Sequence, residues 1–199
     1  MAPNFNVVVS PKSTEVDTTS RGPKQHSERQ IRYQKFFSNL IERIKARPPR
    51  VTNLSRIGYD SWVSTSSGKS GFTFGLAFTA SKRFQIELYI DLGNRLANKN
   101  AFDELLSSRE SIDEELEATL DWQRLDNRRA SRIAWFWEQT VTILDDDKKL
   151  EELIDWALPK YFNFRQAMSQ PLEKLPTYDS KIRPLDDQTP STPDNSVSE

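Results

Sequence analysis

The sequence contains no cysteine and a single histidine, His26. Without cysteine the chain has no disulfide bonds, no thiol nucleophile and no thiolate metal ligand. One imidazole also argues against a histidine-rich zinc site and against a serine triad built on histidine. We therefore predict no metal site, no cofactor and no catalytic residues, and any chemistry would depend on carboxylate, lysine, serine or tyrosine side chains.

Long apolar runs are also missing. Hydrophobic residues make up 36% of the 199 positions, and the mean hydropathy is −0.71. No stretch approaches the roughly 20 apolar residues that cross a bilayer, and the N-terminus lacks the basic and then apolar order of a signal peptide. These features predict a cytoplasmic protein without a membrane partner. The length of the chain is enough for one domain with polar tails.

Alternation with a period of two marks the centre of the chain. Residues 72–80 read FTFGLAFTA and residues 84–91 read FQIELYID, so each run places its large apolar side chains on one face. This pattern predicts two strands, joined by a hairpin at the short polar break between them. A preceding strand at 62–65 completes a meander over 62–91, and a second alternating pair predicts another hairpin over 120–138.

Amphipathic segments are predicted to cover the apolar face of these strands. Ser27 and Gln30 fit a capping box, and a helical stripe of apolar residues follows from Tyr33 to Ile44. A second helix is predicted around 102–116 and a third from about Asp146, which Pro159 should kink or end. The predicted fold is α+β: an antiparallel sheet of about five strands packed against three helices, in the order α-β-β-β-α-β-β-α.

The ends of the chain have a different composition. Residues 1–26 are predicted to form an extended arm and linker, with one apolar patch, FNVVV, at Phe5–Val9. Residues 27–170 form the predicted single α+β domain. Residues 171–199 lose periodicity and repeat Pro, Ser and Thr among acidic residues, so we predict a disordered acidic tail.

The charges are segregated along the sequence. Residues 21–56 contain ten Lys and Arg against two acidic residues, and residues 124–133 contain four Arg against Asp126. Such basic clusters suit contact with a phosphate backbone, although they can also be ordinary solvated faces whose arginines pair with the acidic helix. The candidate nucleic-acid contacts are Arg29, Arg32, Lys35, Lys69, Arg124, Arg128, Arg129 and Arg132.

Two shorter patterns suggest chemistry but are incomplete. The triplet Gly68-Lys69-Ser70 lacks the earlier glycine of a phosphate-binding loop, since position 63 is Val63. Glu87 and Asp91 share a strand face as the carboxylates of a metal-dependent nuclease would, but Tyr89 stands where that class has a lysine. The first pattern is typical of a polar turn, and the second of the solvated side of a sheet.

Several blocks taken together are similar to a known family. The order SGKSGFTF, FQIELYID, NKNAFDELLSSRESIDEEL and LDWQRLDNRRASRI resembles the bacterial and archaeal domain-of-unknown-function family numbered 4268, over about residues 28–168. Domains of this family often follow a part that resembles a restriction-type endonuclease, with a junction similar to residues 3–11 here. The resemblance implies a role beside a nuclease and carries over no catalytic residue. Only residues 1–27 precede the match, so we expect the module without an attached nuclease.

Different functional hypotheses stay open. The leading hypothesis is a non-catalytic accessory module that works with DNA or RNA, or with a nuclease subunit, in DNA restriction or phage defence. The alternative is a protein-interaction module, such as a homodimer in which the Phe5–Val9 arm adds a strand to the partner's sheet edge. A third is a small hydrolase built on Glu87 and Asp91.

Overall fold

The computed structural model describes residues 26–178, which form a five-stranded antiparallel sheet and four helices. The predicted arm at Phe5–Val9 and residues 179–199 of the predicted acidic tail lie outside the described residues. In chain order the elements are α1 (Glu28–Ala46), β1 (Trp62–Ser66), β2 (Phe72–Phe78), β3 (Phe84–Ile90), α2 (Arg95–Leu106), α3 (Arg109–Glu115), β4 (Asp121–Gln123), β5 (Ser131–Phe136) and α4 (Asp147–Lys174).

The strand order across the sheet is β1-β2-β3-β5-β4, and every neighbouring pair is antiparallel. The predicted meander and the predicted second hairpin are both present, and the hairpin joins the meander through the pairing of β3 with β5. In that pairing Leu88 lies opposite Ile133, which keeps the apolar faces of the two units on one side. The α+β fold with its five-stranded antiparallel sheet is therefore confirmed.

The core lies between the sheet and helices α1 and α4. Helix α1 begins with the predicted capping box, in which the Ser27 and Gln30 side chains bond to each other's backbone N–H groups. Its apolar stripe faces the sheet, and the Phe36 ring meets the Phe78 ring edge-on with 5.0 Å between centroids. Phe36 and Phe74 are both buried. Helix α1 covers the hairpin at Phe78 and Phe84, while α4 covers Phe74 through Tyr161 and Phe164.

The structure has four helices where the sequence pattern suggested three. The predicted second helix is divided at Ser107 and Ser108 into α2 and α3. The Ser107 hydroxyl donates to the Glu104 carbonyl at 2.6 Å, and serines that bond the local backbone in this way favour helix ends over helix interiors. The break lets α3 turn, so that Ile112 is buried against the core.

Helix α4 is longer than the proline positions suggested. It continues through Pro159 and Pro171 and ends at Lys174, beyond residue 170 where the sequence placed the domain boundary. Each internal proline removes a backbone hydrogen bond. The burial of apolar side chains on the sheet-facing side of α4 outweighs this cost. Tyr161 and Phe164 are fully buried there, and Leu172 is also buried.

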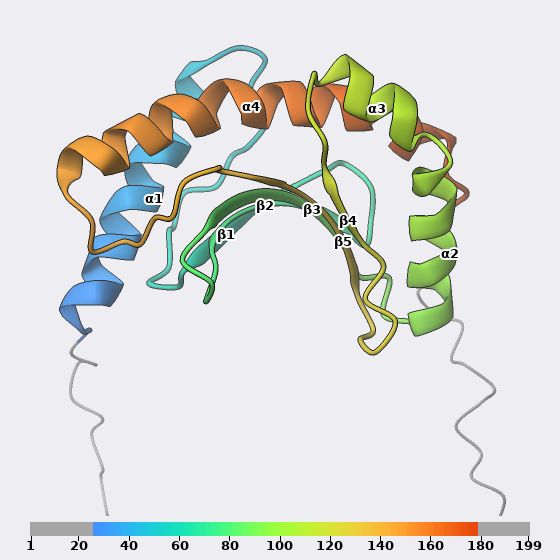
Figure 1. Ribbon diagram of the computed structural model, residues 1–199, viewed down its shortest axis with the longest axis horizontal. Helices are drawn as coiled ribbons and strands as arrows, with labels where there is room; N and C mark the ends of the chain where they lie inside the picture. The colour runs from blue at the N-terminus through green and yellow to red at the C-terminus, as the bar shows by residue number, and fades with distance from the viewer. Residues whose placement is uncertain (1–25, 179–199) are drawn as a thin grey trace, which may run out of the picture.

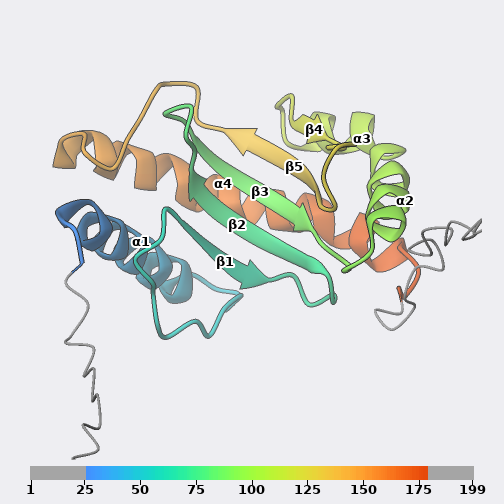
Figure 2. The same cartoon turned by 90° about the horizontal axis from the view of Figure 1, so that it is seen from below.

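The sheet is arched, and the helices lie on its convex side. Figure 1 shows α4 running over the arch with α1 beside it, while α2 stands at the end of the arch near β4 and β5. Figure 2 shows the opposite side, where the strands lie in front of α4 and none of the four helices crosses them. Within residues 26–178, no helix combines the length and apolar content needed to cross a bilayer.

Candidate functional site

The uncovered side of the sheet is formed by every second residue of its strands, and we call it the concave face. The registers place Trp62, Ala77, Gln85 and Phe136 in one row across the strands, Ser64, Gly75, Glu87 and Ala134 in the next, and Ser66, Thr73, Tyr89 and Arg132 in a third. Aromatic residues occur in both outer rows, and across β1, β2, β3 and β5 the middle row has small side chains on either side of Glu87. Strand β4 continues this row with Asp121, opposite Ala134. This distribution leaves a depression in the middle of the face.

The depression is a hollow of about 540 Å³ lined by residues of β1, β2, β3 and β5, which we call the Glu87 hollow. Gly75 makes room for it. A Cβ atom at Gly75 would lie 2.8 Å from both Cγ and Oε1 of Glu87, so any other residue there would push the carboxylate away. Trp62 forms part of the rim and is 55% exposed.

Within the described part of the chain, only one oxygen of the Glu87 carboxylate forms polar contacts with other side chains. Its Oε2 atom accepts a 2.5 Å hydrogen bond from Gln85 Nε2 and lies 3.3 Å from Arg132 Nη1. Its Oε1 atom accepts no hydrogen bond from residues 26–178. Burial raises the pKa of Glu87 above its ordinary value, although the Arg132 charge and the Gln85 hydrogen bond act in the opposite direction. The fold thus keeps a carboxylate where its charge is unfavourable, which is common at functional sites.

We expect Glu87→Gln to raise the Tm at neutral pH. A raised pKa in the folded state means that ionisation of Glu87 costs stability as the pH rises through that pKa, and the uncharged amide removes this cost. The gain in Tm over the parent protein should be largest at about pH 7–8 and should shrink towards about pH 5. Thermal unfolding of both proteins across this range measures the difference, and a gain that grows as the pH falls would contradict the assignment.

A second hollow of about 230 Å³ adjoins the first. Tyr89 and Arg132 line both hollows, so the two lie next to each other on the concave face. The second hollow also receives Arg128 and Arg129 from the turn between β4 and β5, and we call it the arginine hollow. The depression that holds the Glu87 carboxylate therefore adjoins one lined by three arginines and by Asp91.

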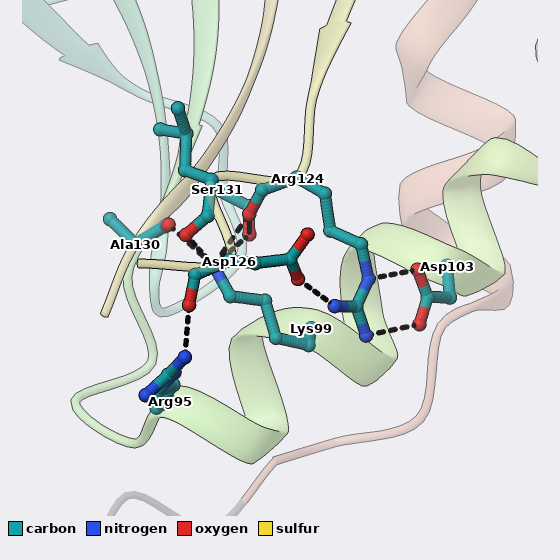
Figure 3. A network of polar contacts seen from close by, with 8 residues as sticks. Arg95, Lys99, Asp103, Arg124, Asp126, Ala130 and Ser131 are labelled. Atoms are coloured by element: carbon teal, nitrogen blue, oxygen red, sulfur yellow. Dashed lines mark hydrogen bonds and ion pairs between the residues drawn. The ribbon is translucent and has the colours of Figure 1, made fainter. Parts of the chain in front are cut away.

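The turn between β4 and β5 is fixed by a buried lysine, Lys99 of α2, which is 4% exposed. Figure 3 shows its ammonium group surrounded by oxygen atoms of the turn. Lys99 Nζ donates to the carbonyls of Arg124 at 2.5 Å, Leu125 at 3.0 Å and Ala130 at 2.8 Å, and lies 3.0 Å from Ser131 Oγ. These contacts hold both ends of the turn to α2.

The four arginines predicted to bind nucleic acid in this region have different surroundings. Arg124 forms a bidentate pair with Asp103 (2.8 and 2.9 Å) and also contacts Asp126 (Figure 3). Arg129 pairs with Asp91 at 2.6 Å, and Arg132 lies against Glu87. Arg128 is exposed and forms no ion pair with residues 26–178. Three of them line the arginine hollow, and Arg124 instead braces the turn.

The other four predicted residues lie away from the concave face. Arg29 donates to the Tyr33 hydroxyl, and Arg32 donates to the Asp145 carbonyl at 2.9 Å. Lys35 is exposed on α1, which lies at the other end of the arch from the arginine turn (Figure 1). Lys69 Nζ donates to the carbonyls of Leu172 and Leu175, where it satisfies groups left free at the end of α4. The two basic clusters of the sequence therefore do not form one surface.

Three contributors to the site were absent from the sequence prediction: Gln85, Lys99 and Trp62. Gln85 could have been suspected because an amide in a strand between Phe84 and Ile86 must find partners. Lys99 carries no sequence signal, since it lies in the polar run NKN. Trp62 was assigned to a strand, but only the arch of the sheet shows that its ring borders the hollow.

The carboxylates proposed for a hydrolase are engaged by arginines. Asp91 lies beside Arg129 rather than next to Glu87, and its pKa is lowered because hydrogen bonds from Arg129 and from the Gly93 N–H outweigh the effect of burial. Among residues 26–178, no three His, Cys, Asp or Glu side chains come together as metal ligands.

Comparison with protein families gives one match. The family model described as Domain of unknown function (DUF4268) matches residues 32–172, a range that includes all the strands and most of the four helices. Searches of curated proteins and of solved structures gave no match.

Proposed function

The chain belongs to the family described as Domain of unknown function (DUF4268), and from this premise we propose that it is a non-catalytic accessory module that binds single-stranded nucleic acid. The proposed binding surface is the concave face. DNA and RNA are both candidate ligands. A nuclease, as the sequence resemblance implies, is the proposed partner, in DNA restriction or phage defence.

The observation that carries the proposal is that the two hollows lie side by side and share Tyr89 and Arg132. A nucleotide combines a flat base with a phosphate a short distance away. The Glu87 hollow offers aromatic and hydrogen-bonding groups for the base, and the arginine hollow offers cations for the phosphate.

The aromatic side chains that line the hollow favour a single strand over a duplex. Trp62 and Tyr89 border the Glu87 hollow on opposite sides of its floor of small residues. Proteins that bind single strands stack unpaired bases on such side chains, and each stacked base contributes roughly 1–3 kcal/mol. In a duplex the faces of the bases are already stacked on each other, so Trp62 and Tyr89 would have no free base to stack on.

We expect the affinity for a labelled single-stranded oligonucleotide to fall as salt rises from about 50 to about 200 mM. Each phosphate contact releases counterions from a single strand and contributes about −0.7 to the slope of log K against log salt concentration. About three such contacts therefore lower the affinity roughly 20-fold over this range. Replacing Arg128 and Arg129 with alanine should reduce that slope by about 1.4. Fluorescence anisotropy at several salt concentrations measures both quantities.

The matched control replaces two exposed cations of α4, Lys148 and Lys174, with alanine. This variant has the same change in net charge but leaves the concave face intact, so its salt slope should equal that of the parent. An affinity that does not change with salt would contradict the proposed surface. So would a salt slope that falls by the same amount in both double variants.

A further inference from the structure

The Glu87 hollow contains hydrogen-bonding groups that the fold leaves unused. Gln85 is 2% exposed, and its Oε1 atom has no partner even though its Nε2 atom bonds to Glu87. Arg132 Nε is likewise buried without an acceptor. Buried polar atoms are nearly always paired in folded proteins, so within the described residues Gln85 Oε1 and Arg132 Nε, together with the free Oε1 atom of Glu87 beside them, mark the hollow as a place for a polar ligand.

These groups form a defined pattern. Glu87 Oε1 and Gln85 Oε1 are acceptors, whereas the guanidinium of Arg132 is a donor. Glu87 and Gln85 share the concave side of β3, and Arg132 lies on β5 opposite Tyr89. A ligand that satisfies this cluster must present donors towards β3 and an acceptor towards Arg132.

Among the bases, guanine has this arrangement on one edge. Its N1–H and its exocyclic amino group are adjacent donors, and O6 beside them is an acceptor. Uracil and thymine present a single N–H between two carbonyls, while adenine and cytosine present an amino group beside unprotonated ring nitrogens. A carboxylate facing those bases would meet an acceptor, which costs affinity because both groups stay unpaired.

We infer that the Glu87 hollow is a specificity pocket for an unpaired guanine, an inference that rests on the proposed function. Glu87 Oε1 and Gln85 Oε1 accept from the N1–H and amino groups, Arg132 donates to O6, and Trp62 or Tyr89 stacks on the ring. The 3′ or 5′ phosphate then lies towards Arg128 and Arg129. Gly75 is required because a side chain there would displace Glu87 Oε1.

The test uses oligothymidylates of about 11 nucleotides, within the usual site size of a single module. One central thymidine is replaced by guanosine, by inosine or by 7-deazaguanosine. We expect guanosine to raise the affinity about tenfold over thymidine, as a bidentate base contact does. Inosine lacks the amino group and should lose most of this gain, whereas 7-deazaguanosine keeps the edge that faces Glu87 and should retain it.

Two variants test the pocket itself. Glu87→Gln and Gly75→Ala should each bring the ratio of guanosine to thymidine affinity to about one, and thermal unfolding verifies that both are folded. Glu152→Gln on α4 is the matched control and should keep the parent ratio. Equal affinity for all oligonucleotides, or a ratio that survives in Glu87→Gln, would overturn the guanine pocket while leaving nucleic-acid binding in place. Absence of binding to every oligonucleotide would instead overturn the proposed function and the pocket with it.

Discussion

Replacing Lys99 with methionine is expected to lower the free energy of unfolding by about 3 kcal/mol. Methionine keeps the length and helix propensity of the side chain but has no N–H group, so the turn loses every hydrogen bond from the ammonium group. The Ala130 carbonyl is affected most, because the Arg124 and Leu125 carbonyls still accept from Ser131 Oγ and from the Arg128 N–H. Urea unfolding followed by tryptophan fluorescence measures the change.

Lys148→Met is the matched control for this experiment. Lys148 is solvent-exposed and pairs only loosely with Glu152 at 3.9 Å, so its replacement should change the stability by less than about 0.5 kcal/mol. If Lys99→Met lowers the free energy of unfolding by no more than this control does, Lys99 does not stabilise the turn. The desolvation of its ammonium group would then cancel the stabilisation by its hydrogen bonds. A large loss would also explain how Arg128 and Arg129 are kept beside the concave face.

Replacing Phe37 with alanine should destabilise the protein by about 3–5 kcal/mol. Phe37 on α1 is fully buried and meets the Phe36 and Phe78 rings at 5.3 and 5.9 Å between centroids. The substitution removes a large apolar surface and leaves a cavity at the centre of the contact between α1 and the sheet, which cannot close without moving several rings. The same urea unfolding experiment measures the loss.

Ile31→Ala is the control on the same helix. Ile31 is 51% exposed, and alanine has the higher helix propensity, so the change should stay within about 0.5 kcal/mol of the parent. A cost for Phe37→Ala below about 1.5 kcal/mol would mean that α1 is not an essential cover of the sheet. The core described above would then require revision.

The candidate site was only partly predictable. Arg128, Arg129 and Arg132 were identified from a cluster of like charges in a turn, and the structure places all three beside the concave face. Lys69 looked equivalent in the sequence but is bonded to the end of α4, more than a hundred residues away. Charge composition identifies cations, but only long-range contacts decide which of them are already used.

The sequence alone determined the strands, the first helix and the side of each that is buried, because periods of two and 3.6 are local properties that one face of each element must satisfy. The division at Ser107–Ser108, the length of α4 and the burial of Lys99 were decided by tertiary packing, since each depends on residues distant in the chain. The shape of the concave face was likewise decided by tertiary packing. The sequence pattern predicts a solvated surface on the outer side of the strands. Only the arch of the sheet and the space above Gly75 make this surface a hollow in which Glu87 keeps one carboxylate oxygen free of hydrogen bonds from the described residues.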